Sequence, residues 1–357
     1  MKGDNEMKIY SRKRIMIITI IVLLLVNLSM SCVAESALNV GLVFDIGGKG
    51  DKSFNDSASR GLSWAANDFG IKRIELEPGA DADREVNLRN LSAIGYDFII
   101  GVGFLFEDSI KTVSDEFPDT KYAIVDSFIP EKTNVVSLTF AEHEGSFLVG
   151  MIAGLKALQD GEDTVGFVGG MKTSLIERFE AGYIAGVKHV YPDCRLLSAY
   201  AGDTPTAFAD PVKGKELALS QYDNGAHVIF HASGLTGAGV YEAGKERKKY
   251  IIGVDSNQNY MGFIEETGEN FGLTSMLKQV DVSVYLAIKS AVDGNFESGL
   301  KVYDLSTQVE IDGVNYNGVG YALDEYNKDL ITEEMIQQVE EAKQQIIDGD
   351  IIVPAEL

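Results

Sequence analysis

Cysteine is scarce in this chain. Its 357 residues include two, Cys32 and Cys194, so a framework of several disulfides is excluded. Cys32 follows an apolar run near the N-terminus, whereas Cys194 lies deep in the sequence. If Cys32 carries a modification, Cys194 has no partner, and we expect no internal disulfide in the mature chain.

Basic side chains are also few. Lysine and arginine total 31 against 54 aspartates and glutamates, which gives a net charge of −23. The charge becomes more negative still when residues 1–31 are left out, because basic residues outnumber acidic ones there. Such a chain repels a phosphate backbone, so we expect no nucleic-acid partner. The acidic residues are typical of a solvated surface.

No apolar run is long enough to span a membrane. The longest near the N-terminus covers residues 15–26, about twelve residues where a spanning helix needs roughly twenty. Lys8, Arg12, Lys13 and Arg14 precede it, and small or polar residues follow it up to Cys32. This is the layout of a secretory signal peptide over residues 1–31.

Cys32 is a candidate for lipidation, because bacterial lipoproteins are cleaved directly before a cysteine that receives the lipid. The preceding residues read LSMS, with Ser29 where a leucine is usual and Leu28 one place early. We therefore expect a lipid anchor at Cys32 that holds the protein at the cell membrane, facing the periplasm or the exterior. An ordinary secreted protein and an uncleaved anchor are the alternatives.

The usual cofactor and metal motifs are missing. Residues 47–50 read GGKG, but a P-loop would need glycine at Val43 and serine or threonine at Gly50. A dinucleotide fingerprint would need glycine or alanine at Ser53. The histidines lack a recognised ligand spacing; they are His143, His189, His227 and His231. We expect no cofactor and no metal.

Strand and helix patterns alternate along the chain. At 45% hydrophobic and 357 residues, the chain is too long for one core, so two domains are expected. Short β-rich runs separated by helical periodicity predict parallel sheets with helical crossovers. The strand candidates are 39–44, 98–102, 122–125, 135–140, 164–168, 227–231, 250–254 and 272–276. The helix candidates include 57–69, 144–159, 176–190, 213–224, 237–248 and 280–292.

Polar side chains follow several of these strands. Asp45, Asp126 and Asp255 each come directly after an apolar strand, and the strand at 227–231 leads into Gly234. Each aspartate alone could cap a helix or form an Asx turn. Three aspartates at equivalent strand ends instead favour one shared ligand-binding cleft, because ligands of open α/β sheets bind at the carboxyl ends of strands.

Six ordered motifs resemble the basic membrane protein family. They are GLVFDIGGKGDKSFND (41–56), GVGFLFED (101–108), EGSFLVG (144–150), VGFVGGM (165–171), GVDSNQ (253–258) and LTSMLKQVD (273–281). Members of this family are lipid-anchored substrate-binding proteins of ABC transporters, and characterised members bind purine nucleosides. The resemblance implies an α/β, type I periplasmic-binding-protein fold with two Rossmann-like lobes joined by three crossovers.

The resemblance also implies discontinuous lobes. Lobe one is expected over residues 38–141 and 272–301, the second piece including the strand at 273–276. Lobe two is expected over residues 142–271 and 302–357.

The family's ligand-binding positions can be carried over residue by residue. Asp45 and Phe54 match the pair that holds and stacks on the base, with Asn55 beside them. Phe208 matches the aromatic residue that covers the opposite face of the base. The group around the ribose is matched by Asp126, Gly234, Asp255 and Lys278.

One difference from the family's pattern leaves the preferred nucleobase undecided. Purine-binding relatives often have asparagine directly after the first aspartate, where this chain has Ile46. Inosine, guanosine and adenosine are all candidate ligands. A nucleotide is disfavoured, because three carboxylates and one lysine would repel a phosphate dianion.

The resemblance implies an ABC permease as the membrane partner and no enzymatic activity. Two other classes of protein are alternatives. A nucleoside-cleaving enzyme would suit several aspartates, but residues 45–51 read DIGGKGD and lack the DxDxGxDD cluster of nucleoside hydrolases. A ligand-sensing receptor domain shares the fold but would need an attached signalling module.

Overall fold

Two six-stranded sheets organise the chain, which a computed structural model describes from residue 37 to residue 357. The expected signal peptide at 1–31 and the lipidation candidate Cys32 lie outside the described residues. Within residues 37–357, every helix is too short or too polar to cross a lipid bilayer.

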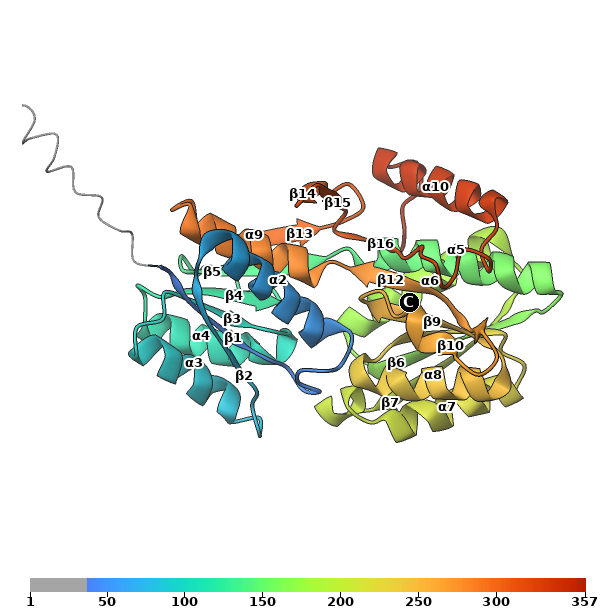
Figure 1. The fold of residues 1–357 in the computed structure, drawn as a ribbon, viewed down its shortest axis with the longest axis horizontal. Coiled ribbons are helices and arrows are strands. Elements are labelled where there is room, and N and C mark those ends of the chain that lie inside the picture. Colours follow the sequence, from blue (N-terminus) through green and yellow to red (C-terminus); the bar gives the residue numbers. More distant parts are fainter. Residues whose placement is uncertain (1–36) are drawn as a thin grey trace, which may run out of the picture. The chain divides into compact units, whose positions relative to one another are not determined.

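The first sheet is parallel throughout. Its strands run in the order β13 (Gly299–Tyr303), β5 (Val135–Phe140), β4 (Lys121–Val125), β3 (Phe98–Gly101), β1 (Asn39–Val43) and β2 (Lys72–Leu76). Helices α2 (Phe54–Phe69) and α9 (Val280–Val292) pack together on one face, and α3 (Asp83–Ala93) and α4 (Glu107–Glu116) cover the other (Figure 1).

Burial on both faces explains why these strands are apolar runs. Val40 and Leu42 pack in the cluster that includes Leu62 of α2, whereas Val43 packs with Leu88 of α3. Successive side chains of a strand point to opposite faces, so a parallel strand covered by helices on both sides needs apolar residues at nearly every position.

The second sheet has the order β16 (Val319–Tyr321), β12 (Gly272–Lys278), β9 (Tyr250–Asp255), β8 (Val228–Ala232), β6 (Thr164–Met171) and β7 (Arg195–Gly202). All neighbours are parallel except β16, which runs antiparallel to β12. Helices α5 (Glu142–Asp160) and α6 (Ser174–Val190) pack together on one face, and α7 (Pro211–Asp223) and α8 (Gly237–Arg247) on the other.

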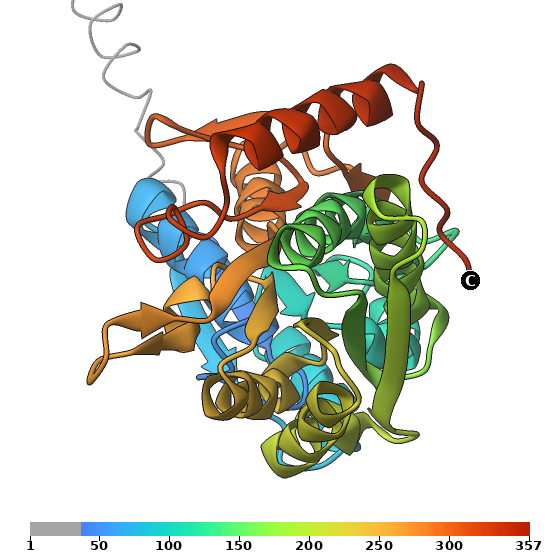
Figure 2. The ribbon, with the colours of Figure 1, turned by 90° about the vertical axis from the view of Figure 1, so that its right-hand side faces the viewer.

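One further helix, two hairpins and several 3-10 turns complete the fold of the described residues. Helix α10 (Glu333–Asp348) lies beside α5 (Figure 2). Two hairpins are formed by β10 (Phe263–Ile264) with β11 (Glu269–Asn270) and by β14 (Val309–Ile311) with β15 (Val314–Tyr316). Single 3-10 turns are η1 (Phe104–Phe106), η2 (Pro205–Phe208), η3 (Gly234–Thr236) and η4 (Asn259–Gly262).

We call the first sheet with its helices lobe one and the second sheet with its helices lobe two. The chain passes between them after β5, after β12 and after β13.

The strand expected at 273–276 was placed in the wrong lobe. It is part of β12, which pairs with β9 and β16 in the second sheet. The chain returns to lobe one only after Lys278, with α9 and β13. The strand's apolar residues identify it as a buried strand, but they carry no information on which sheet supplies its partners, so sequence patterning could not correct the boundary.

Candidate ligand-binding site

A cavity lies where the carboxyl ends of strands from both sheets face each other, with about 550 Å³ of space between protein atoms when the open solvent at its mouth is included. This is the edge at which open α/β sheets bind ligands. All eight predicted binding residues line the cavity; they are Asp45, Phe54, Asn55, Asp126, Phe208, Gly234, Asp255 and Lys278. Lobe one contributes the first four, and lobe two contributes the last four.

The loop between β1 and α2 is held in shape by Asp51 and Asn55. The carboxylate of Asp51 accepts hydrogen bonds from the backbone N–H groups of Ser53, Asn55 and Asp56 at 2.8–3.1 Å. It thereby satisfies donors that the start of α2 leaves free. The carboxamide of Asn55 accepts from the N–H of Asp45 at 2.9 Å and donates to Asp51 at 3.0 Å.

These bonds change what Asn55 can do. Its amide also donates to the backbone oxygen of Ile46 at 3.4 Å, so both N–H donors already have partners in the loop. The sequence suggested Asn55 as a ligand contact. In the structure Asn55 lines the cavity, and its hydrogen bond to the N–H of Asp45 positions that residue.

Asp45 stands at the cavity in a setting that disfavours its charge. Burial raises the pKa of its carboxyl to about 7, against the opposing effects of the Ile46 N–H and of Arg84. The guanidinium of Arg84 lies 3.5 Å from Oδ1 of Asp45. At neutral pH the carboxyl can therefore be present in both protonation states, as hydrogen-bond donor or as acceptor.

Lys278 forms the charged centre of the cavity. Its ammonium lies 2.6 Å from Asp126 of lobe one and 3.4 Å from Asp255 of lobe two. Burial alone would lower the pKa of Lys278, but these two carboxylates and Glu142 outweigh it and raise the pKa. The lysine is therefore charged, and it links the two lobes.

Asp126 and Asp255 occupy matching backbone positions. Each stands at the end of a strand, β4 and β9, with a φ of 63° and 64° respectively. Left-handed backbone is uncommon outside glycine, asparagine and aspartate, and it clusters at functional sites. Oδ1 of Asp126 is buried and has no hydrogen-bond partner among residues 37–357, so it is available to a ligand donor.

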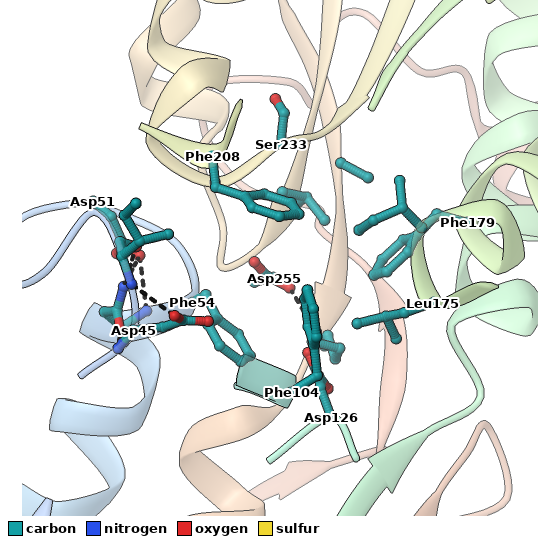
Figure 3. Close-up of a pocket in the computed structure, with 17 residues that line it drawn as sticks. Asp45, Asp51, Phe54, Phe104, Asp126, Leu175, Phe179, Phe208, Ser233 and Asp255 are labelled. Atoms are coloured by element: carbon teal, nitrogen blue, oxygen red, sulfur yellow. Dashed lines mark hydrogen bonds and ion pairs between the residues drawn. The ribbon is translucent and has the colours of Figure 1, made fainter. Parts of the chain in front are cut away.

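Aromatic rings enclose the cavity from both lobes (Figure 3). Phe208 points in from lobe two, opposite Phe54 and Phe104 of lobe one. Phe104 and Phe208 meet edge to face with ring centroids 6.4 Å apart. The ring of Phe54 also lies 4.6 Å from the ammonium of Lys278, within the range of a cation–π contact.

Room for Phe208 depends on Gly170 in β6. A Cβ atom at this position would lie 2.2 Å from Cε1 of Phe208, so any larger residue would displace the ring. Gly234 similarly adopts a φ of +56° beside the backbone of Phe208. These two glycines explain how lobe two brings an aromatic ring close to its own strand ends.

Some residues of the cavity wall were not predicted from the sequence. The first turns of α6 contribute Leu175, Ile176 and Phe179, and the loop after β1 contributes Asp51. Apolar residues early in a helix look the same whether they face a core or a ligand cavity, so only their position after β6 could have suggested them. Phe104 also lines the cavity, whereas Phe106 and Phe147 are buried in the cores.

Hydrogen bonds also join the lobes directly beside the cavity. The hydroxyl of Ser53 donates to Asp255 at 2.6 Å, and the amide of Gln258 donates to the backbone oxygen of Lys52 at 3.1 Å. The hydroxyl of Ser256 donates to the backbone oxygen of Ser53 at 3.2 Å. The described conformation is therefore one in which the two lobes are in contact around the site.

The described residues contain no group of three or more acidic, histidine or cysteine side chains placed to hold a metal ion. His231 is fully buried, which lowers its pKa to about 4, and it does not line the cavity. His227, directly before β8, is hydrogen-bonded to Asp160 at the end of α5 at 2.7 Å and does not line the cavity.

Two lobes of parallel sheet, three chain crossings and a polar, aromatic cavity between strand ends define a solute-binding protein of the type I periplasmic class. The chain belongs to the Bmp family, described as ABC transporter substrate-binding protein PnrA-like, whose model matches residues 38–356. The family resemblance and the fold class predicted from the sequence are thereby confirmed.

Individual relatives agree with this assignment. The chain is 40% identical to the CD4+ T-cell-stimulating antigen of Listeria monocytogenes, with 88% of this chain and 87% of the relative covered. It is 32% identical to the ABC transporter nucleoside-binding protein BmpA of Lactococcus lactis, with 96% and 99% covered. A crystal structure of an ABC transporter solute-binding protein from Aeropyrum pernix has 30% identity and a TM-score of 0.76, with 89% and 94% covered.

Proposed function

We propose that this substrate-binding protein captures a nucleoside between its lobes and presents it to an ABC permease. The observation that carries the proposal is the pairing of Phe54 from lobe one with Phe208 from lobe two at one cavity that also holds Asp45, Asp126 and Lys278. A planar base fits between aromatic rings, each contributing about 0.5 to 1.5 kcal/mol beyond the area it buries.

The polar groups suit the two ends of a nucleoside. Asp45 faces the cavity beside Phe54 and would meet the edge of the base. Asp126 and Asp255 would accept hydrogen bonds from the ribose hydroxyls, while the ammonium of Lys278 would donate to a sugar oxygen. Because Lys278 is already neutralised by both carboxylates, the site offers no free cation to a phosphate, and nucleotides are disfavoured.

The name of the Lactococcus relative supports nucleosides as the ligand class. Ile46 lines the cavity with an apolar side chain where purine-binding relatives often have asparagine. The base is therefore left to experiment, with inosine, guanosine and adenosine as candidates. The remaining part of the proposal is a lipid anchor at Cys32, which rests on the signal-like sequence before it.

Calorimetric titration of the protein from Cys32 onward tests the ligand. Inosine, guanosine, adenosine, cytidine and ribose are compared, and at least one nucleoside is expected to bind far more tightly than ribose. No heat with any nucleoside, together with clear heat for a sugar or a peptide, would refute the nucleoside assignment. Chromatography of the inosine sample for released hypoxanthine tests the enzyme alternative, for which a base would accumulate.

Lipidation has a separate test. Expression of the full chain in bacteria fed labelled palmitate is expected to give a labelled, membrane-bound protein, and Cys32→Ser to give an unlabelled one. Equal labelling of both would place the anchor elsewhere.

A further inference from the structure

A second cavity adjoins the first and is not needed for a simple nucleoside. Its empty space is about 770 Å³, and it shares Phe104, Asp126 and Leu175 with the ligand cavity. The remaining walls come from both lobes, including Thr139 of β5 and Arg178 of α6. The two cavities therefore share part of one wall, at the side where the proposed ribose group stands.

The second cavity contains a buried acceptor without a partner. Glu142 at the start of α5 lines the space and has no solvent exposure. Its Oε2 lies 3.4 Å from the guanidinium of Arg178, but among residues 37–357 no donor reaches its Oε1. Oδ1 of Asp126, on the shared wall, is likewise buried and unpaired. A buried unpaired acceptor costs about 1 to 3 kcal/mol, so two facing one space indicate that the space receives hydrogen-bond donors.

The side chains that line the second cavity disfavour an anion. Glu107, Asp126 and Glu142 line it against one cation, Arg178. Glu107 is already satisfied, because Lys111 and the hydroxyl of Ser127 both donate to it. Burial raises the pKa of Glu142 to about 7, which is the expected response of a carboxyl with no nearby donor on one oxygen.

We propose that the site takes nucleosides extended beyond the sugar ring, with a hydroxyl- or amine-bearing group that enters the second cavity and donates to Glu142 and Asp126. The inference rests on the proposed nucleoside function. With the base beside Asp45 and the ribose beside Asp126, the proposal requires that a substituent on the 5′ carbon pass Asp126, the residue common to both cavities. The ligand class is then wider than free nucleosides and still excludes phosphorylated ones.

Three inosine derivatives of equal length test this on the wild-type protein. They carry 2-hydroxyethyl, 2-aminoethyl or carboxymethyl groups on the 5′ oxygen. The first two are expected to bind as tightly as inosine within about threefold, and the third at least about thirtyfold more weakly, because a carboxylate would face Glu142 and Asp126.

Two results would overturn the proposal. A loss of more than about thirtyfold for all three derivatives would mean that the second cavity admits no extension. Equal affinities for all three would mean that the extension does not meet the carboxylates. Absence of inosine binding itself would instead refute the proposed nucleoside function, so the two failures are distinguishable.

Two matched variants test whether Glu142 makes the contact with the extension of the nucleoside. Glu142→Gln is expected to weaken binding of the aminoethyl derivative relative to inosine about tenfold, since the charge-assisted bond is lost. Glu107→Gln, a change of the same kind in the same cavity, is expected to leave the ratio of the two affinities unchanged. The same loss in both variants would indicate a general charge effect and contradict a specific role for Glu142. If Glu142→Gln does not fold, the derivative series with the wild-type protein still decides the proposal.

Discussion

Asp45 shows how a single residue depends on its surroundings. Its backbone N–H is bonded by Asn55, its carboxyl lies 3.5 Å from Arg84, and a Cβ on Gly103 would lie 2.1 Å from its Oδ2. Gly103 has a φ of +105°, which makes glycine the suitable residue for both the backbone and the space. The carboxyl is thus held in one place with a pKa near neutrality.

That pKa predicts a pH dependence of ligand binding. Inosine offers an N–H at the base edge, so it binds best to the ionised, accepting form of Asp45. Because the free protein has a pKa of about 7 at Asp45, the affinity for inosine is expected to rise as the pH increases from about 5.5 to 8 and then to level off. Calorimetry across this range measures it.

Asp45→Asn provides the control, because the amide cannot ionise in this range. The variant is expected to show a flatter profile than the wild-type protein. A profile of unchanged steepness would mean that another group, such as Glu142, causes the dependence.

Phe54 and Asp126 contribute to binding by different physical effects. Phe54→Ala removes a stacking ring and Asp126→Ala removes an acceptor and the main partner of Lys278. Each is expected to weaken nucleoside binding at least tenfold, about 1.4 kcal/mol, while the lobes remain folded. Titration with the best ligand measures affinity, and circular dichroism measures folding.

Phe263→Ala is the control, because this ring is partly exposed and lies outside the cavity. Unchanged affinity in both test variants would show that the ligand binds at another site.

At the scale of elements, the central strands were predictable, whereas three edge strands were not. The strands at 98–101, 121–125 and 135–140 are buried on both faces and read as apolar runs. The three strands that were not predicted from the sequence are β2, β7 and β13, each of which lies at the edge of a sheet. Their partly exposed residues, such as KRIEL in β2, mix charge with apolar side chains, because an edge strand is covered less completely than a central one.

Strand β6 yields a prediction of its own. Gly170→Ala would push the ring of Phe208 toward the ligand, since the added Cβ lies 2.2 Å from it. Affinity is expected to fall by about tenfold, about 1.4 kcal/mol, with a small change in Tm because the ring can move into the cavity. Gly202→Ala in the neighbouring strand β7, where the added Cβ would be 3.5 Å from Ala207, is the matched control. A loss of affinity no larger than that of the control would show that Phe208 does not depend on Gly170.

At the scale of the molecule, the site is completed only when the lobes meet. Lys278 extends from β12 of lobe two to Asp126 of lobe one, and Ser53 of lobe one donates to Asp255 of lobe two. We expect the ligand-free protein to open about the three crossings and the ligand to favour the closed form. Small-angle scattering is expected to show a smaller radius of gyration once a nucleoside is added.

Ser53→Ala tests the contribution of the contacts between lobes. The variant loses the bond from its hydroxyl to Asp255, and affinity is expected to fall by about fivefold, close to the 1 kcal/mol of a typical hydrogen bond. Ser63→Ala serves as the control, because Ser63 lies within α2 and its hydroxyl is bonded to Ser59 and Arg73, both of lobe one. Equal affinity of the two variants would show that this bond does not stabilise the closed form.

The sequence by itself determined the central strands and the convergence of Asp45, Asp126 and Asp255 on one cleft, because buried parallel strands require apolar runs and polar residues at strand ends meet at one edge of a sheet. Its resemblance to the family supplied the type I fold and the other predicted cavity residues. Only the tertiary structure decided that β12 pairs in lobe two, that the amide of Asn55 is engaged by its own loop, and that Glu142 faces a second cavity. Strand partners, satisfied donors and empty space are relations between distant residues, and no local pattern of side chains encodes them.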